Sequence, residues 1–271
     1  MAPRTKPADD VDSVPRMPKG ARKTGYPGFV APMLASTRSR PPAGAHWLHE
    51  IKFDGYRLNA YIRSGRIKLL TRSGLDWTAR FGKDLVAAFA GLKLKEAIID
   101  GEVVVEGVGS VPNFSALQDA LATGRTDKLV FYAFDLLYLD RYDLRSSPLV
   151  ARKAALEAII IAPGMVRYSE HCEEDGERLF RHACRLGLEG VISKVRNAPY
   201  RSGRSKEWTK SKCANRQEFV VTGYVPLTVS STAIGSLVLG YSDDGKLIHA
   251  GRVGTGFSHK VRRICFAALT H

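Results

Sequence analysis

The chain has 271 residues, of which 44% are hydrophobic and 25% charged, values typical of a globular protein with one large or two ordinary domains. No stretch approaches the roughly 20 apolar residues of a membrane span, and the polar start at Met1–Lys6 predicts no secretory signal. A formal net charge of +14 favours a polyanionic partner. Four cysteines without zinc-type or paired spacing predict reduced thiols in a cytoplasmic protein.

The predicted elements begin after a polar N-terminal stretch. Residues 1–25 mix Pro, Lys, Arg and Asp, and predict a flexible basic tail. Runs rich in β-branched and aromatic residues predict strands, and amphipathic runs closed by Gly or Pro predict helices. The predicted strands are 49–53, 58–63, 67–70, 97–105, 128–138 and 189–194. The predicted helices are 81–92, 113–122, 149–161 and 173–186, the third ended by Pro163-Gly164.

The texture of the sequence changes after Arg216. Three β-rich runs, 219–225, 236–241 and 247–253, precede a short basic helix at 258–269, and Asp243-Asp244-Gly245 predicts a hairpin turn. We place a domain boundary near Asn215. The sequence therefore predicts an α+β protein: a domain at 26–214 of sheets with flanking helices, and a small antiparallel β-domain at 215–271.

One motif combines a lysine with a turn. The stretch Lys52-Phe53-Asp54-Gly55-Tyr56-Arg57 comes at the end of a predicted strand. Apolar neighbours and nearby cations favour the neutral form of a lysine amine, which is the nucleophilic form. Glycine allows close approach of the backbone to a ligand, and an arginine fork suits phosphate or ribose oxygens. A β-hairpin with a solvated lysine has the same pattern, so this motif alone leaves both interpretations open.

Five further motifs follow in order. Each alone is weak, because Asp-Gly and Glu-Gly pairs usually form turns and aromatic strands are usually core. We expect the motif at 100–102 to place carboxylates at a sheet edge, and the motif at 208–212 to present two lysines on one strand face. The motifs are Thr71-Arg72-Ser73-Gly74, Asp100-Gly101-Glu102, Phe131-Tyr132-Ala133-Phe134-Asp135, Glu189-Gly190-Val191-Ile192-Ser193-Lys194 and Trp208-Thr209-Lys210-Ser211-Lys212.

Together and in this order, the motifs resemble those of ATP-dependent DNA ligases, most closely the ligase module of bacterial end-joining ligases. The resemblance covers roughly 27–260, including Pro32-Met33-Leu34-Ala35 and Gly251-Arg252-Val253-Gly254-Thr255-Gly256. It implies an ATP-grasp-like nucleotidyltransferase (adenylation) domain of antiparallel sheets, followed by an OB-fold domain. Because an OB fold has five strands and three β-runs precede His271, we expect a truncated OB domain without the last basic motif, which orients pyrophosphate in related ligases.

The resemblance also implies a reaction. Lys52 would attack the α-phosphate of ATP and form lysyl-AMP, AMP would pass to the 5′-phosphate of a nick, and the 3′-hydroxyl would displace it. Lys210 and Lys212 would neutralise charge on the α-phosphate. Asp54 would assist the metal or the attacking hydroxyl.

The remaining implied roles concern the nucleotide and a metal. Glu50 and the backbone at Ile51 would read the adenine edge, and Phe134 and Val191 would enclose the purine. Arg57 and Arg72 would hold the ribose and the 5′-phosphate of the nick. Glu102 would bind the ribose or a metal, and Glu189 would bind Mg²⁺ or Mn²⁺. Lys194 would contact a phosphate.

The implied partner is duplex DNA with nicks or breaks, together with end-joining repair proteins, for a monomeric enzyme acting at the bacterial nucleoid. The stretch from Lys194 to Arg216, with eight Lys or Arg against one Glu, would contact DNA phosphates with little sequence preference. Three alternatives stay open. They are an RNA ligase, a capping-type nucleotidyltransferase, and a DNA-binding accessory with weakened catalysis.

Overall fold

The computed structural model describes residues 17–161, 164–213, 219–243, 245–254 and 256–270. The chain forms two compact units, the first of which ends at Cys213. Parts of the predictions for the N-terminal tail, the helix end at Pro163, the boundary near Asn215, the turn at Asp244 and the Gly251–Gly256 motif lie outside the described residues.

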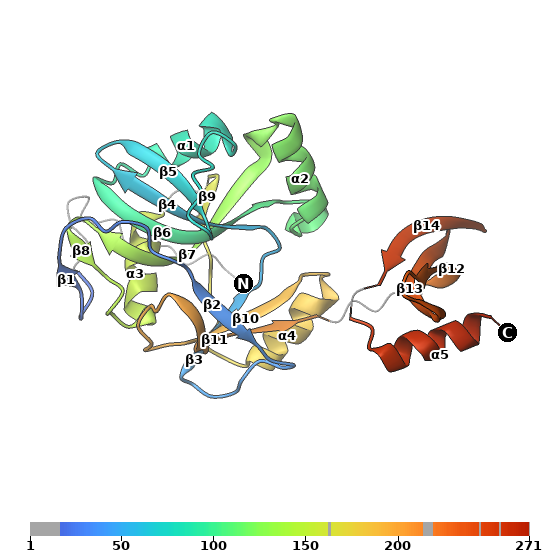
Figure 1. The fold of residues 1–271 in the computed structure, drawn as a ribbon. Coiled ribbons are helices and arrows are strands. Elements are labelled where there is room, and N and C mark those ends of the chain that lie inside the picture. Colours follow the sequence, from blue (N-terminus) through green and yellow to red (C-terminus); the bar gives the residue numbers. More distant parts are fainter. Residues whose placement is uncertain (1–16, 162–163, 214–218, 244, 255, 271) are drawn as a thin grey trace. The chain divides into compact units, whose positions relative to one another are not determined.

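A seven-stranded sheet forms the larger half of the first unit (Figure 1). A path of six strands has the order β1-β8-β7-β6-β4-β5, and β9 pairs parallel with β7. Apolar side chains of these strands and of the helices α1, α2 and α3 form the main core. The strands are β1 (Arg22–Lys23), β4 (Tyr56–Arg63), β5 (Arg66–Thr71), β6 (Glu96–Val105), β7 (Leu129–Leu139), β8 (Tyr142–Asp143) and β9 (Val166–Tyr168). The helices are α1 (Gly82–Ala90), α2 (Phe114–Thr123) and α3 (Leu149–Ile159), with 3₁₀ turns at Val108–Ser110 and Thr126–Lys128.

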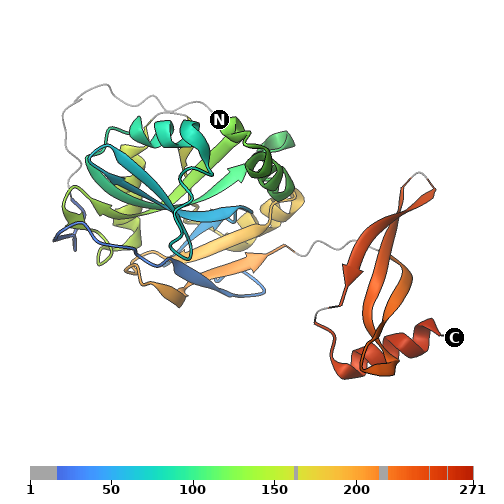
Figure 2. The ribbon, with the colours of Figure 1, turned by 45° about the horizontal axis from the view of Figure 1, so that its top comes forward.

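A four-stranded sheet forms the other half, in the order β2-β11-β10-β3. Its strands are β2 (Met33–Thr37), β3 (Trp47–Ile51), β10 (Gly190–Val195) and β11 (Gly203–Lys212). Helix α4 (Gly176–Arg185) packs on β10, where Phe180, Ala183 and Val191 form a separate apolar cluster. Figure 2 shows this sheet beside the seven-stranded one.

The connection from β3 to β4 crosses between the two sheets. Strand β3 pairs with β10, and β4 pairs with β5 and β6, so Lys52–Gly55 is not the turn of a β-hairpin. A Cβ at Gly55 would clash with the carbonyl oxygen of Val103, because the crossing chain passes close to β6. The hairpin interpretation of the lysine motif is therefore excluded.

Three expectations about local structure are wrong. The predicted flexible tail is ordered over its described part, since β1 pairs with β8 and Ala21 packs on the core. The carboxylates of the Asp100-Gly101-Glu102 motif lie on β6, an inner strand with partners on both sides, not on a sheet edge. Helix α4 begins at Gly176 rather than residue 173, because the Asp175 side chain accepts hydrogen bonds from the first turn and caps the helix there.

The prediction of four reduced thiols is wrong for two of them. Cys184 of α4 and Cys213, the residue after β11, form a disulfide, with Cα atoms 5.3 Å apart. The pair is separated by 29 residues, and only the packing of α4 beside the four-stranded sheet brings it together. Cys172 and Cys265 are free cysteines.

The second unit is small. Strands β12 (Val220–Leu227), β13 (Ser230–Asp243) and β14 (Lys246–Val253) form an antiparallel sheet in the order β12-β13-β14. Helix α5 (His259–Leu269) packs on β13, with Arg262 donating to the carbonyls of Ile234 and Gly235. None of the helices in the described residues is long and apolar enough to cross a membrane.

Candidate active site

A cavity of about 210 Å³ contains most of the predicted site residues. Both sheets contribute, and so does the crossing segment between them. Its lining is Leu34, Ala35, Glu50, Ile51, Lys52, Phe53, Arg57, Arg72, Glu102, Phe134, Ile192, Lys194, Arg204, Trp208 and Lys210. Asp54, Glu189, Val191 and Lys212 are the predicted residues outside this lining.

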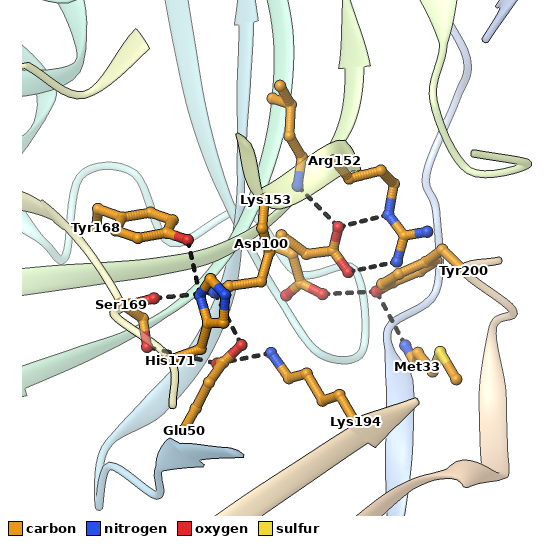
Figure 3. Close-up of polar contacts among 12 residues, drawn as sticks. Met33, Glu50, Asp100, Arg152, Lys153, Tyr168, Ser169, His171, Lys194 and Tyr200 are labelled. Atoms are coloured by element: carbon orange, nitrogen blue, oxygen red, sulfur yellow. Dashed lines mark hydrogen bonds and ion pairs between the residues drawn. The ribbon is translucent and has the colours of Figure 1, made fainter. Parts of the chain in front are cut away.

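The deep wall of the cavity carries a buried carboxylate between two amines. Glu50, 2% exposed, lies with Oε1 2.8 Å from the Lys153 Nζ and Oε2 2.8 Å from the Lys194 Nζ (Figure 3). Burial raises the pKa of a carboxyl, but the two lysines outweigh it and hold the pKa of Glu50 below its usual value. Burial also lowers the pKa of Lys194 to about 8, against the attraction of Glu50. Glu50 is thus held as an acceptor.

Aromatic rings and cations form a second wall. The Lys194 Nζ lies 4.3 Å from the ring centre of Phe134 and 4.2 Å from that of Trp208, and the Arg57 Cζ lies 4.4 Å from that of Phe134. The apolar partner opposite was predicted to be Val191, which is wrong. Alternation along β10 turns Val191 toward α4, and Ile192 lines the cavity instead.

Arg57 is held by a buried acid. Its Nε and one terminal nitrogen donate to the Asp100 carboxylate at 2.6 and 2.7 Å, and Asp100 is fully buried. Asp100 also accepts from the Tyr200 hydroxyl at 2.6 Å, which in turn accepts from the Met33 amide. The guanidinium therefore enters the cavity in a fixed orientation, with part of its fork already occupied.

The crossing segment places Lys52 against an acid. The Lys52 Nζ and the Glu189 carboxylate form an ion pair, and the Lys212 Nζ lies 2.7 Å from the other Glu189 oxygen. Burial opposes the two amines, which nevertheless lower the pKa of Glu189. Burial raises the pKa of Glu102 to about 7, although Arg57 and Lys52 act against it. Burial, then the neighbouring Lys212 and Lys52, lower the pKa of Lys210.

Two predicted residues occupy outer positions. Arg72 is exposed on the turn after β5 and reaches the rim of the cavity, and Asp54 is exposed on the crossing segment. The remaining lysines lie on one strand: Lys210 lines the cavity and Lys212 is exposed beside it, consistent with their period of two on β11.

Several site residues were not predicted. Asp100 holds Arg57, Tyr200 donates to Asp100, and Lys153 pairs with Glu50, whereas Trp208 lines the cavity itself. Arg152 and Lys153 are consecutive on α3 and fully buried, which is rare for cations unless they are paired. The pairing acids lie on distant strands, so nothing in the local sequence indicates this burial.

The donor set can be tested against a metal. Within the described ranges, no three His, Cys, Asp or Glu residues cluster as a possible metal cage. Mg²⁺ usually binds one or two carboxylates and completes its shell with water and substrate phosphate. Glu102 lines the cavity together with Lys52, and Glu189 is paired with Lys52. These two carboxylates fit Mg²⁺ or Mn²⁺ held together with a phosphate.

Comparison with known proteins decides the family. A family model described as "ATP dependent DNA ligase domain" matches residues 32–212, which contain the cavity and all its lining residues. The chain belongs to this family. The first unit is accordingly a nucleotidyltransferase-like ligase domain, built mainly from antiparallel sheets.

Relatives of this ligase domain include larger proteins. The multifunctional non-homologous end joining protein LigD of Pseudomonas aeruginosa is 45% identical over 248 residues, covering 90% of this chain and 29% of the relative. This chain thus spans less than a third of that protein. A structure of mycobacterial DNA ligase D complexed with ATP and MES gives a TM-score of 0.62 at 34% identity, covering 89% of this chain and 77% of that one. The ligase domain of Mycobacterium tuberculosis LigD gives 0.61 at 35% identity, covering 88% and 77%.

Proposed function

We propose that this chain is an ATP-dependent DNA ligase that seals nicks between a 5′-phosphate and a 3′-hydroxyl through lysyl-AMP on Lys52. The observation that carries the proposal is the position of Lys52. The crossing segment brings its amine into a cavity lined by a buried acceptor, an aromatic ring and several cations. This is the chemistry that a purine nucleoside triphosphate requires.

The position of each side chain in the cavity suggests which part of ATP it binds. Glu50 and the Ile51 backbone bind the adenine edge, with Phe134 and Ile192 against its faces. Arg57, already oriented by Asp100, donates to ribose or phosphate oxygens. The Lys52 ammonium leaves its ion pair with Glu189 and loses a proton to water. The neutral amine then attacks the α-phosphorus, and the bond to pyrophosphate breaks as the phosphorus–nitrogen bond forms.

Lys210, which lines the cavity, and Lys212 beside it neutralise the negative charge that develops on the α-phosphate. Glu102 and Glu189 would hold Mg²⁺ or Mn²⁺, which supplies further positive charge at the phosphate oxygens. In the later steps AMP moves to the 5′-phosphate, and the 3′-hydroxyl displaces it. Arg72 and Asp54 lie at the rim and on the exposed crossing segment, where they would face the nick.

The proposal extends to DNA and to cellular role. Exposed basic side chains of β11 and its flanks would contact duplex phosphates. The second unit would act as an OB-type domain on the same duplex. The relatives named for non-homologous end joining support a role in break repair in the bacterial cytoplasm, with a monomeric ligase module working beside end-joining proteins.

The test is covalent labelling with α-labelled ATP and Mg²⁺, resolved by denaturing electrophoresis. Wild type should carry label, whereas Lys52→Ala should lose it and Lys52→Arg should fail equally, because a guanidinium stays protonated. Lys68→Ala, at an exposed lysine outside the cavity lining, is the matched control and should label normally. Label surviving in Lys52→Ala would identify another nucleophile. Labelled GTP and nicked RNA substrates separate this enzyme from capping enzymes and RNA ligases.

A further inference from the structure

We propose that Lys153 is a positioning residue that sets the choice of nucleobase, by holding Glu50 as a carboxylate that accepts from the 6-amino group of adenine. This inference rests on the proposed function of the cavity as an ATP site. Lys153 itself does not line the cavity. It acts from behind, through Glu50.

The contacts of Lys153 leave it no other partner of opposite charge among the described residues. Its side chain is fully buried, and its Nζ lies 2.8 Å from the Glu50 Oε1. The same Nζ donates to the Ser169 carbonyl oxygen at 2.9 Å and lies 4.6 Å from the ring centre of Tyr168. Figure 3 shows Lys153 and Lys194 approaching Glu50 from two sides. Helix α3 thus places the Lys153 ammonium behind the cavity wall, against Glu50.

Glu50 keeps hydrogen-bonding capacity for a ligand. Its Oε2 accepts from Lys194 at 2.8 Å and from the Ser169 hydroxyl at 3.4 Å. Its Oε1, although close to the Lys153 amine, accepts no well-aligned hydrogen bond within the described chain. Each carboxylate oxygen has two lone pairs, so Glu50 keeps acceptor capacity that a ligand amine can use beside the two lysines.

Lys153 and Lys194 both lie against the Glu50 carboxylate and favour its ionised form. The charged and titratable groups around Glu50 are Lys153 from α3, Lys194 from β10, and Tyr168 and His171 from the segment at and after β9. Lys194 also lies over Phe134 and lines the cavity, so it can contact the nucleotide directly. Lys153 is the cation whose effect reaches the ligand only through Glu50.

The chemical consequence is a choice between purines. Adenine presents a 6-amino donor to a carboxylate, whereas guanine and hypoxanthine present a 6-oxo acceptor that a carboxylate repels. A protonated Glu50 could donate to the 6-oxo group. Removal of the Lys153 charge should raise the pKa of Glu50, because burial then meets less opposition.

The experiment compares ATP and ITP binding, which needs no covalent step, using the fluorescence of Trp208 in the cavity lining. Wild type should bind ATP at least tenfold more tightly than ITP. In Lys153→Met this preference should fall at least tenfold and should fall further at pH 6 than at pH 8. Lys153→Arg, which keeps the charge, should recover most of the preference. Loss of labelling without loss of ATP preference would count against the proposed function alone.

A double-mutant cycle guards against a purely structural effect. Glu50→Gln should lose the preference by itself, because its amide can donate to a 6-oxo group. Adding Lys153→Met to Glu50→Gln, a double variant that also removes the buried unpaired charge, should change the preference no further. Equal weakening of ATP and ITP in Lys153→Met, or a further change of preference in the double variant, would overturn the proposal.

Discussion

Breaking the buried ion pair between Arg152 and Asp135 should strongly destabilise the first unit. Both side chains are fully buried, and Arg152 donates to the two carboxylate oxygens at 2.7 and 2.9 Å. It also donates to the carbonyls of Ser147 at 2.6 Å and Ala198 at 3.1 Å. Arg152→Met would leave Asp135 with a hydrogen bond from the Leu136 amide and no direct ion pair among the described residues. Removing one partner of such a pair costs roughly 3 to 5 kcal/mol.

The measurement is urea unfolding followed by tryptophan fluorescence, which reports the first unit because all three tryptophans lie there. With a urea dependence of about 2.5 kcal/mol per M, the midpoint should fall by roughly 1 to 2 M. The matched control is Arg145→Met, which breaks a half-exposed pair with Asp143 and should cost about 1 kcal/mol or less.

The double variant Arg152→Met with Asp135→Leu should recover at least half of the lost stability, because it removes both buried charges. The reasoning is refuted if Arg152→Met costs no more than Arg145→Met. It is also refuted if the double variant is as unstable as Arg152→Met, since the loss would then not come from an unpaired acid.

Two further outcomes are expected. Burial raises the pKa of Glu102 to about 7. The folded state therefore binds more protons than the unfolded state between about pH 4.5 and 7. Because of this difference, the contribution of Glu102 to the free energy of unfolding falls as the pH rises through that range. Glu102→Gln should remove that part of the pH dependence in metal-free urea titrations at pH 5 and 8, and an unchanged slope would contradict the assignment. Arg201→Glu with Lys206→Glu, two exposed positions in the basic stretch from Lys194 to Arg216, should weaken nicked-duplex binding and make its salt dependence shallower while ATP labelling persists. Lys83→Glu, exposed on α1, is the control, and equal loss of binding in it would reject a localised DNA surface.

The sequence was most informative where chemistry and chain order coincide. Lys52, Glu102, Phe134 and Lys210 were predicted from motifs on strands, and the structure brings all of them to one cavity. The strands could be predicted because these runs are short, apolar and bounded by glycine. Their joint order carried the family resemblance, which no single motif could carry.

The residues behind the cavity wall were not predictable in the same way. On an amphipathic helix, Arg152 and Lys153 look like solvated cations, and only the tertiary partners Asp135 and Glu50 explain their burial. The choice between Val191 and Ile192 failed for another reason. Both neighbours are apolar, so alternation along the strand is visible but the side that faces a ligand is not.

The four-stranded sheet joins the two ends of the ligase domain. Strand β11 pairs parallel with β2 and antiparallel with β10, and β10 pairs with β3, so the first and last strands of this sheet are neighbours. During synthesis, β2 and β3 emerge long before their partners exist. A nascent chain therefore cannot assemble the nucleotide cavity until it has been made through Lys212, and ATP can stabilise only the completed domain, not an intermediate on the ribosome.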